Sequence, residues 1–333
     1  LKFLQILLWY ISDCEDMFRD KLGAKRKEDF KKELAAKRMR NRKMRDQAAG
    51  WLFAAPAIIG FVVLTLLPMI FSLYWSMTDF NVFRSVTNFI GLDNYRNMFG
   101  SSELYFKDAL KATGYYSILN VPASILFSFS VALMLSSSIR GRGIFRSIFY
   151  LPSIIPAVAS CMVWVWLLNQ QYGLINTVLK AVGITPPGWI WDKKTVIPTL
   201  VMINLWSTGG TMVIFLAGIM SIPKVYYEAL VMDGGNAFHK LIYITVPMVT
   251  PTIFFNSIMA IIGSLQVFTQ GYIMTEGGPG HATRSFVMQI YNTAFEYFRM
   301  GEASAYAWVL FIAVMIITVI QFKVQDKWVN YDA

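Results

Sequence analysis

Residues 221–251 read SIPKVYYEALVMDGGNAFHKLIYITVPMVTP, and this stretch decides the fold. Pro223 can begin a helix, because its missing N–H would have no partner in the first turn anyway. The apolar residues that follow predict one face of a short amphipathic helix; they are Val225, Tyr226, Ala229, Leu230 and Met232. Gly234 and Gly235 end this helix, since glycine adopts left-handed helix-end geometry without steric cost.

The second half of this stretch predicts a second short helix that leads into an apolar run. Asn236 is a suitable N-cap, and Pro247 and Pro251 should kink or loosen the first turns of the segment that follows. Two short helices with a sharp bend, continuous with a long apolar helix, can transmit force from a soluble partner into a membrane. The alternative is a surface loop that only links two membrane spans.

Working outward, the whole chain is too apolar for an ordinary soluble protein. Of its 333 residues, 56% are hydrophobic and 15% are charged, and the mean hydropathy is +0.47, whereas soluble domains carry roughly 25% charged residues. The apolar residues fall in runs of about 20, the length that a helix needs to cross a bilayer. We therefore predict an all-α polytopic membrane protein with six spans, at 51–76, 110–136, 148–168, 198–220, 246–271 and 306–322.

Basic residues are distributed unevenly among the connecting segments, and this predicts the topology. Segment 25–45 is dense in Lys and Arg, as are the loops after spans two and four; the basic residues of these loops and the tail are Arg140, Arg142, Arg146, Lys224, Lys240, Lys323 and Lys327. By the positive-inside rule both termini are cytoplasmic. We predict a basic cytoplasmic extension (1–48), a six-helix membrane domain (49–325) whose coupling loop covers about 221–247, and a cytoplasmic tail (326–333).

Several function classes are not supported by the sequence. The net charge of +10 sits largely in one N-terminal segment and short loops, so it does not indicate nucleic-acid binding. Two distant cysteines and two histidines suggest neither a disulfide framework nor a metal site. No segment matches the phosphate-binding pattern G-x-x-x-x-G-K-[ST], so we expect ATP chemistry to reside on other chains.

The 221–251 stretch resembles the EAA motif of binding-protein-dependent ABC importer permeases, whose pattern is roughly E-A-A, three residues on D-G-A, then I-x-L-P. The matching residues are Glu228, Ala229, Asp233, Gly234, Ile244 and Pro247. Three positions depart from the pattern: Leu230 and Gly235 stand where alanine is usual, and Val246 stands where leucine is usual. These departures are small and apolar.

Further segments resemble the carbohydrate-uptake branch of that family. PSIIPAVAS (152–160) is similar to the opening of the family's third span, and TEGGPGHAT (275–283) is similar to its extracellular T-x-G-G-P-x-x-x-T stretch. YNTAFEYFRMGEASA (291–305) strengthens the match. The resemblance covers roughly residues 50–325. Maltose- and glycerol-phosphate-type permeases have two homologous membrane subunits, and the sequence is most similar to the one of the pair named F or A.

The resemblance implies a transport subunit rather than an enzyme, in a bacterial cytoplasmic membrane. The EAA loop would dock as a coupling helix on a cytoplasmic ATPase; the implied coupling residues are Glu228, Ala229, Asp233, Gly234, Gly235 and Pro247. The implied partners are a second homologous permease subunit, two ATPase subunits that bind ATP and Mg²⁺, and an extracellular solute-binding protein. No cofactor or metal is expected on this chain.

Polar residues at membrane depth are candidates for a solute site, because burying them there is costly. They are Asn120, Ser153, Asn204, Ser207, Asn256, Gln266 and Gln270, with Trp206 beside them. Amides can bond sugar hydroxyls, and an aromatic ring can pack on a sugar's C–H face. Family resemblance narrows the set to Ser153, Asn204, Trp206, Ser207, Gln266 and Gln270. For each, a helix–helix hydrogen bond or an interfacial anchor is an alternative role.

Three other functions remain open at this point. The solute could be polar but not a sugar. An ion-coupled secondary transporter would carry an ionisable residue inside the membrane or an inverted repeat, and we see neither in the sequence. A membrane scaffold or a subunit that handles polysaccharide chains would work without an extracellular binding protein.

Overall fold

The computed structural model describes residues 37, 39, 42–84, 86–100, 104–137 and 140–330, and all regular elements in that part are helices. The predicted extension 1–48 therefore lies mostly outside the described residues. The chain divides into two units, 1–71 and 72–333, which are treated separately. Three single helices are long and apolar enough to cross a membrane within the described part, or up to six if each of three bent pairs is one span.

The first unit contributes most of one long apolar helix, Arg42–Ser76. Within it, η1 (Val62–Leu66) is a π-helical turn, and Leu67 N–H donates to Val62 O before α2 (Leu67–Ser76) continues. Pro68 follows directly and has no N–H to donate, so the altered bonding pattern next to it has a local cause. The helix extends beyond the predicted span 51–76 at its N-terminal end.

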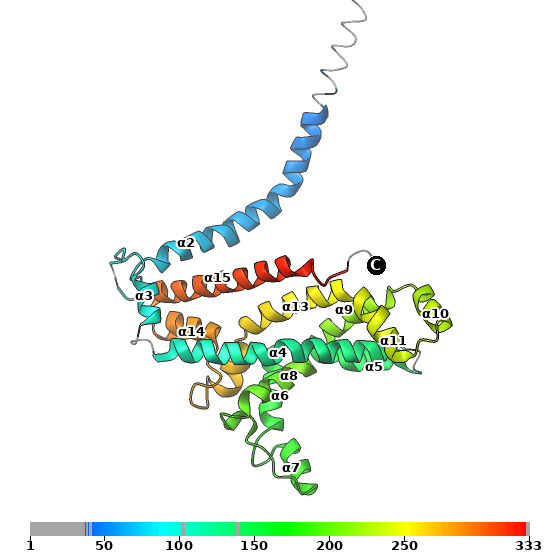
Figure 1. Cartoon of the computed structure of the whole chain (residues 1–333). Coiled ribbons are helices and arrows are strands. Elements are labelled where there is room, and N and C mark those ends of the chain that lie inside the picture. Colours follow the sequence, from blue (N-terminus) through cyan, green and yellow to red (C-terminus); the bar gives the residue numbers. More distant parts are fainter. Residues whose placement is uncertain are drawn as a thin grey trace, which may run out of the picture. The chain divides into compact units, whose positions relative to one another are not determined.

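The second unit is built around α4 (Leu104–Ser136), the counterpart of the predicted span 110–136. It packs against α8 (Val196–Trp206), α9 (Gly209–Met220) and α13 (Thr250–Leu265). In Figure 1, α14 (Phe286–Tyr291) lies at one end of α4, and α5 (Arg142–Tyr150), α10 (Lys224–Met232) and α11 (Ala237–His239) lie at the other. The two ends of α4 thus lie next to different sets of helices.

The predicted third span is two helices rather than one. α5 and η2 (Leu151–Ile154) meet α6 (Ala157–Leu167) at 101°. Ile155 is extended (φ −68°, ψ 130°), as is usual before a proline, and Pro156 cannot continue a helical hydrogen-bond ladder. Segment 148–168 therefore begins inside α5 and crosses the bend.

The fourth and fifth predicted spans are also bent. α8 and α9 meet at 54°, and the helix Ala237–Met248 meets α13 at 66°. The second bend falls at Val249, between Pro247 and Pro251, and η4 (Lys240–Thr245) is a π-helical stretch just before α12 (Val246–Met248). This confirms the kink predicted from the two prolines.

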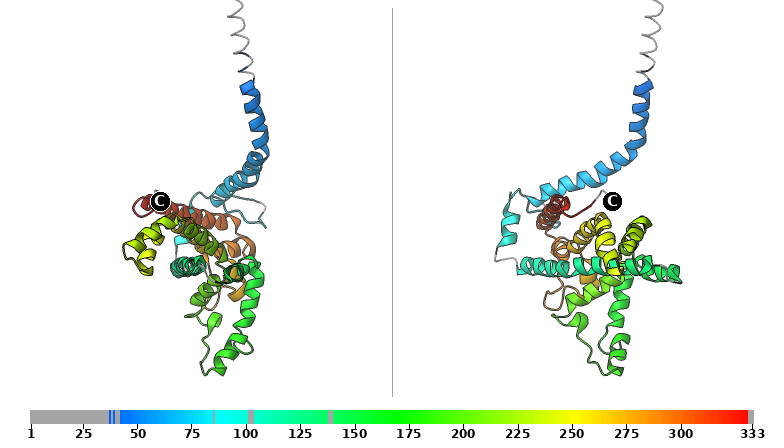
Figure 2. Two further views of the ribbon diagram at one scale, coloured as in Figure 1. Left: turned by 90° about the vertical axis from the view of Figure 1, so that its right-hand side faces the viewer. Right: turned by 45° about the vertical axis from the view of Figure 1, so that its right-hand side comes forward.

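The connecting segments of the second unit carry further short helices. These are α3 (Asp93–Phe99), α7 (Leu174–Ala181), η3 (Trp189–Trp191), η5 (Gly271–Thr275) and η6 (Asn292–Glu296), and the last long helix is α15 (Met300–Gln325). α6 and α7 project away from α13 and α15 in every view (Figure 1, Figure 2).

In the segment before α3, the pKa of the Asp79 carboxyl lies below its ordinary value. The Asn88 backbone N–H and side-chain amide donate hydrogen bonds to this carboxylate, and the positive charge of Arg84 is near it.

Candidate functional site

A polar cavity of about 430 Å³ lies beside α4, between α8, α9, α13 and segment 266–270. Its lining residues are Tyr116, Asn120, Ser124, Ala157, Asn204, Ser207, Thr208, Thr211, Met259, Ala260, Gly263, Ser264, Gln266, Val267, Phe268, Thr269 and Gln270. None of these described lining residues is charged. The cavity therefore offers hydroxyls, amides and two aromatic rings to a ligand.

One face of α4 supplies the polar wall of this cavity. Tyr116, Asn120 and Ser124 are spaced four residues apart, and this spacing places side chains on the same face of a helix. Asn120 is 5% exposed and Tyr116 is buried. Polar groups this deep in an apolar environment need partners, because water is scarce there.

The partners of Asn120 come from two other helices. Asn204 Nδ2 on α8 donates to Asn120 Oδ1 at 2.8 Å, and Asn120 Nδ2 donates to Ser264 Oγ on α13 at 2.8 Å. At the other end of the wall, the Tyr116 hydroxyl donates to Gln270 Oε1 at 3.3 Å. The chain Asn204–Asn120–Ser264 holds three helices in one register around the cavity.

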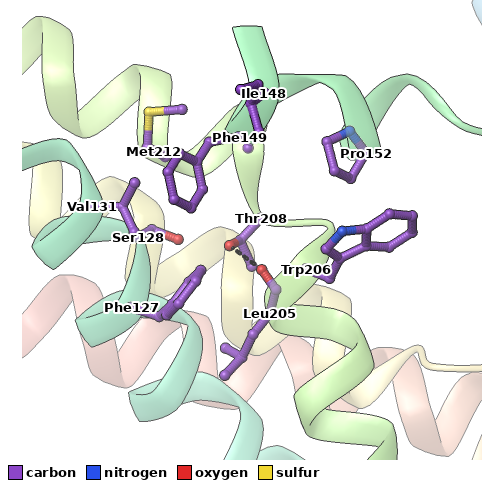
Figure 3. A pocket seen from close by; sticks show the side chains of 11 residues that line it. Phe127, Ser128, Val131, Ile148, Phe149, Pro152, Leu205, Trp206, Thr208 and Met212 are labelled. Atoms are coloured by element: carbon purple, nitrogen blue, oxygen red, sulfur yellow. Dashed lines mark hydrogen bonds between the residues drawn. The ribbon is translucent and has the colours of Figure 1, made fainter. Parts of the chain in front are cut away.

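Four of the six predicted solute residues line this cavity, namely Asn204, Ser207, Gln266 and Gln270. Trp206 lies instead at a second, largely apolar cavity of about 130 Å³ (Figure 3), and its ring packs edge-on against Trp164 at 5.6 Å. The Ser153 hydroxyl donates to Tyr150 O at 2.7 Å within η2, and Ser153 lines neither cavity.

The structure adds cavity residues that the sequence prediction left out. Asn120 was among the polar candidates but not in the narrowed set, whereas Tyr116, Ser124 and Ser264 were not singled out. The four-residue spacing on α4 is the signal that could have found two of them. Asn256, another polar candidate, does not line the cavity. It is buried, and its Nδ2 has no hydrogen-bond partner among the described residues.

We expect Asn120→Leu to destabilise the protein strongly. The leucine would remove the partner of the Asn204 amide and leave the buried Ser264 hydroxyl unsatisfied, and a buried unsatisfied group costs about 1–3 kcal/mol. The matched control is Ser128→Ala, two turns further along α4, since Ser128 is fully buried and its Oγ has no partner among the described residues. Thermal unfolding in detergent should show a lower Tm for Asn120→Leu and an unchanged Tm for Ser128→Ala. Equal shifts in Tm for the two variants would contradict the bridging role of Asn120.

The predicted coupling loop is well defined at the other end of α4. α10 ends at Met232, and Gly234 adopts φ +79°, the left-handed region expected of a helix-ending glycine. Gly235 N–H donates to Leu230 O at 2.8 Å and Gly234 N–H donates to Val231 O at 3.0 Å. This pair of bonds is the Schellman arrangement of a helix C-terminus, so the predicted stop at the two glycines is confirmed.

The second short helix begins as predicted. Asn236 Oδ1 accepts from His239 N–H at 3.0 Å, while the Asn236 N–H donates to His239 Nδ1 at 3.3 Å. This reciprocal capping box satisfies two helix-end donors. The Tyr227 and Thr245 hydroxyls lie 3.0 Å apart and join α10 to η4.

The apolar face of α10 differs from the predicted one. Tyr227 and Leu230 pack on a buried cluster formed by α4, α9 and η4, whereas Val225, Tyr226 and Met232 are exposed, Met232 at 87%. Glu228 and Ala229 are also exposed. α10 is therefore anchored on one side and presents a mixed apolar and acidic surface on the other.

Comparison with known proteins is consistent with these features. The family described as "Binding-protein-dependent transport system inner membrane component" matches residues 124–330. The chain is 39% identical to the probable ABC transporter permease protein YesP of Bacillus subtilis, over 87% of this chain and 94% of that protein. It is 29% identical to the trehalose/maltose transport system permease protein MalF of Thermococcus litoralis, over 85% of this chain and 95% of that protein.

Two further comparisons concern a lactose transporter and a solved structure. The lactose transport system permease protein LacF of Rhizobium radiobacter is 31% identical, over 82% of this chain and 91% of that protein. A chain of the bacterial alginate ABC transporter, solved with an alginate pentasaccharide-bound periplasmic protein, superposes with a TM-score of 0.75. It is 23% identical and covers 85% of this chain and 96% of that chain, so it establishes the fold alone.

Proposed function

Because this chain belongs to the family of inner membrane components of binding-protein-dependent transport systems, we propose that it carries a sugar or oligosaccharide across the membrane. It is a multi-pass membrane permease and a transport subunit, not an enzyme. The sugar assignment is supported by the uncharged cavity of amides and hydroxyls, and by relatives named for maltose, trehalose and lactose transport. An amide group can both donate a hydrogen bond to a sugar hydroxyl and accept one from it.

In this proposal Asn204, Ser207, Gln266 and Gln270 bind the solute from this half of the pathway. Asn120 and Ser264 hold Asn204 in place through the hydrogen bonds described above. Phe268, at the edge of the same cavity, offers a ring face to the C–H face of a sugar. A second, homologous permease subunit supplies the opposite wall, and a separate solute-binding protein delivers the sugar from outside.

Energy reaches the pathway through the coupling loop. The exposed side of α10, with Glu228, Ala229 and Met232, docks on a cytoplasmic ATPase that binds ATP and Mg²⁺, and the bend at Asp233, Gly234 and Gly235 keeps this helix in position. Leu230 and Tyr227 pass its movement to α4, α9 and η4, and Pro247 lies where η4 and α12 lead into α13. Closure of the ATPase then shifts the permease between inward- and outward-facing states.

The basic residues support an orientation with both termini in the cytoplasm. Arg142, Lys224 and Lys240 come from the loops after spans two and four, and the three side chains line one common cavity at the coupling-loop end of α4. A shared basic end agrees with the positive-inside rule. The 275–283 stretch would then face the outside, where a binding protein docks.

The coupling role can be tested with a charge reversal on α10. Glu228→Lys should reduce co-purification of the ATPase, and solute-stimulated ATP hydrolysis, by at least about tenfold, because misplacing a charge at a docked interface costs ~2 kcal/mol or more. Asp326→Lys is the matched control, since Asp326 is an exposed acid on the same proposed side of the membrane. ATP hydrolysis that stays solute-stimulated in Glu228→Lys would rule out docking through this face.

A further inference from the structure

A third cavity, of about 710 Å³, lies at the coupling-loop end of α4, and none of the proposed solute-binding residues lines it. It is bounded by the last turn of α4, the start of α5, the end of α9, α10, α11 and η4. These elements lie together at one end of the second unit (Figure 1). Three cationic side chains from separate segments line it: Arg142, Lys224 and Lys240.

The charge of this cavity is one-sided. None of its described lining residues is acidic, and within the part of the chain that the structure describes no ion pair involves Arg142, Lys224 or Lys240. Like charges that share a cavity repel one another unless an anion lies between them. Lys240 is partly buried, whereas Arg142 and Lys224 are exposed, and together the three positive charges make the cavity attractive to an anion.

Arg146 adds a fourth positive charge next to this cavity, although it does not line it. Its Nη2 donates to Leu135 O at 3.2 Å and to Met220 Sδ at 3.4 Å, which fixes the guanidinium between the ends of α4 and α9. Its Nε is buried and has no partner among the described residues. Met220 itself lines the cavity, so Arg146 reinforces the same positive field.

The remaining surroundings are those of a membrane interface. α5 exposes Ile144, Phe145 and Ile148, while Arg142 and Arg146 lie on its other side, and a basic amphipathic helix of this kind lies in the headgroup region. Leu133, Ile219 and Ile222 give the cavity an apolar wall next to its cations. A ligand that carries both a phosphate and an apolar body matches both surfaces.

We propose that this cavity binds the headgroup of an anionic phospholipid from the cytoplasmic leaflet. Lys224 and Lys240 belong to the coupling loop, whereas Arg142 belongs to α5, so one phosphate would tie the coupling loop to the membrane surface. Basic pockets between helices on the cytoplasmic side are suited to such headgroups. The site depends on the membrane orientation proposed above but not on the solute, so lipid binding and sugar transport can fail independently.

The test uses the full chain assembled with its partner subunits and reconstituted in nanodiscs. Fluorescent phosphatidylglycerol is titrated into phosphatidylcholine discs that hold either the unchanged protein or Arg142→Gln with Lys240→Gln. Removing the two cations should weaken phosphatidylglycerol binding by roughly fivefold each, about 25-fold together. Lys323→Gln with Lys327→Gln is the matched control, because it removes the same charge on the same side of the membrane, away from the cavity.

Four results would overturn the proposal. The first is equal phosphatidylglycerol binding by the cavity variant and its control. The second is equal affinity for phosphatidylcholine and phosphatidylglycerol in the unchanged protein. The third is displacement of the labelled lipid by millimolar inorganic phosphate, which would identify a soluble anion as the ligand. If the cavity variant loses its association with the ATPase but still binds phosphatidylglycerol like the unchanged protein, the ligand of the cavity would be an acidic segment of the ATPase instead.

Discussion

Replacing Gly209 by alanine should displace α9 at its bend with α8 and lower both stability and transport, whereas the same change at the neighbouring Gly210 should not. A Cβ at Gly209 would lie 2.5 Å from Phe149 O and 2.8 Å from Tyr150 Cα. Both are backbone atoms, so no side-chain rotation can relieve the clash. α9 would have to move away from α5 and η2, and overpacking of this kind costs about 1–3 kcal/mol.

Gly210 is the internal control for this prediction, because a Cβ there would meet no atom within 4 Å. Gly210 also lies in α9, where alanine is favoured over glycine by about 1 kcal/mol. Gly209→Ala should therefore lower Tm, whereas Gly210→Ala should leave Tm unchanged or raise it. Solute-stimulated ATP hydrolysis should follow the same order. Matching Tm values for the two variants would show that the contact with α5 is not required.

The second large effect concerns Leu230 and Gly235, two of the three departures from the EAA pattern, which lie against each other in the structure. A Cβ at Gly235 would lie 2.5 Å from Leu230 Cγ and 2.9 Å from Leu230 O, so both the larger side chain and the backbone at 230 occupy the space that an alanine at 235 would need. We expect Gly235→Ala to distort the coupling loop and lower ATP hydrolysis. Leu230→Ala in the same chain should restore part of it, because it removes the contact with Leu230 Cγ, while the contact with Leu230 O and the loss of the Leu230 anchor on the buried cluster remain.

A double-mutant cycle measures this compensation. The coupling energy between Gly235→Ala and Leu230→Ala should lie in the range of about 0.5–3 kcal/mol that contacting residues show. Gly234→Ala serves as the control, because its cost comes from the positive φ of +79° and no atom lies within 4 Å of its Cβ position. Leu230→Ala should therefore not rescue Gly234→Ala. Strict additivity for both pairs would refute the compensation.

The helix ends and the kink of segment 221–251 could be predicted from the sequence because their signals are local, whereas the predicted apolar face of α10 was wrong and the coupling role stays a prediction. The helix stop at Gly234 and Gly235, the cap at Asn236 and the kink between Pro247 and Pro251 each depend on residues within a turn or two. The helical membrane fold followed in the same way from apolar runs of the right length. None of these features requires knowledge of what the segment packs against.

The cavity could be predicted only in part, because it depends on how helices meet. Trp206 is the last residue of α8, and the break that follows it leaves its ring beside Trp164 rather than in the polar cavity. Ser153 lies in η2, before the 101° bend at Pro156, so the bend separates it from the cavity. Asn120 becomes important only once α8 and α13 both pack against α4.

In the proposed solute cavity, the Asn204–Asn120–Ser264 chain would make some changes of solute preference costlier to stability than others. Asn204 both faces the cavity and holds its wall together, so altering it for a new solute also removes a bond between two helices. Ser207 and Gln266 line the same cavity without a side-chain hydrogen bond to the described residues. A lineage that diverges toward a different sugar should therefore change positions 207 and 266 first and retain the asparagine pair.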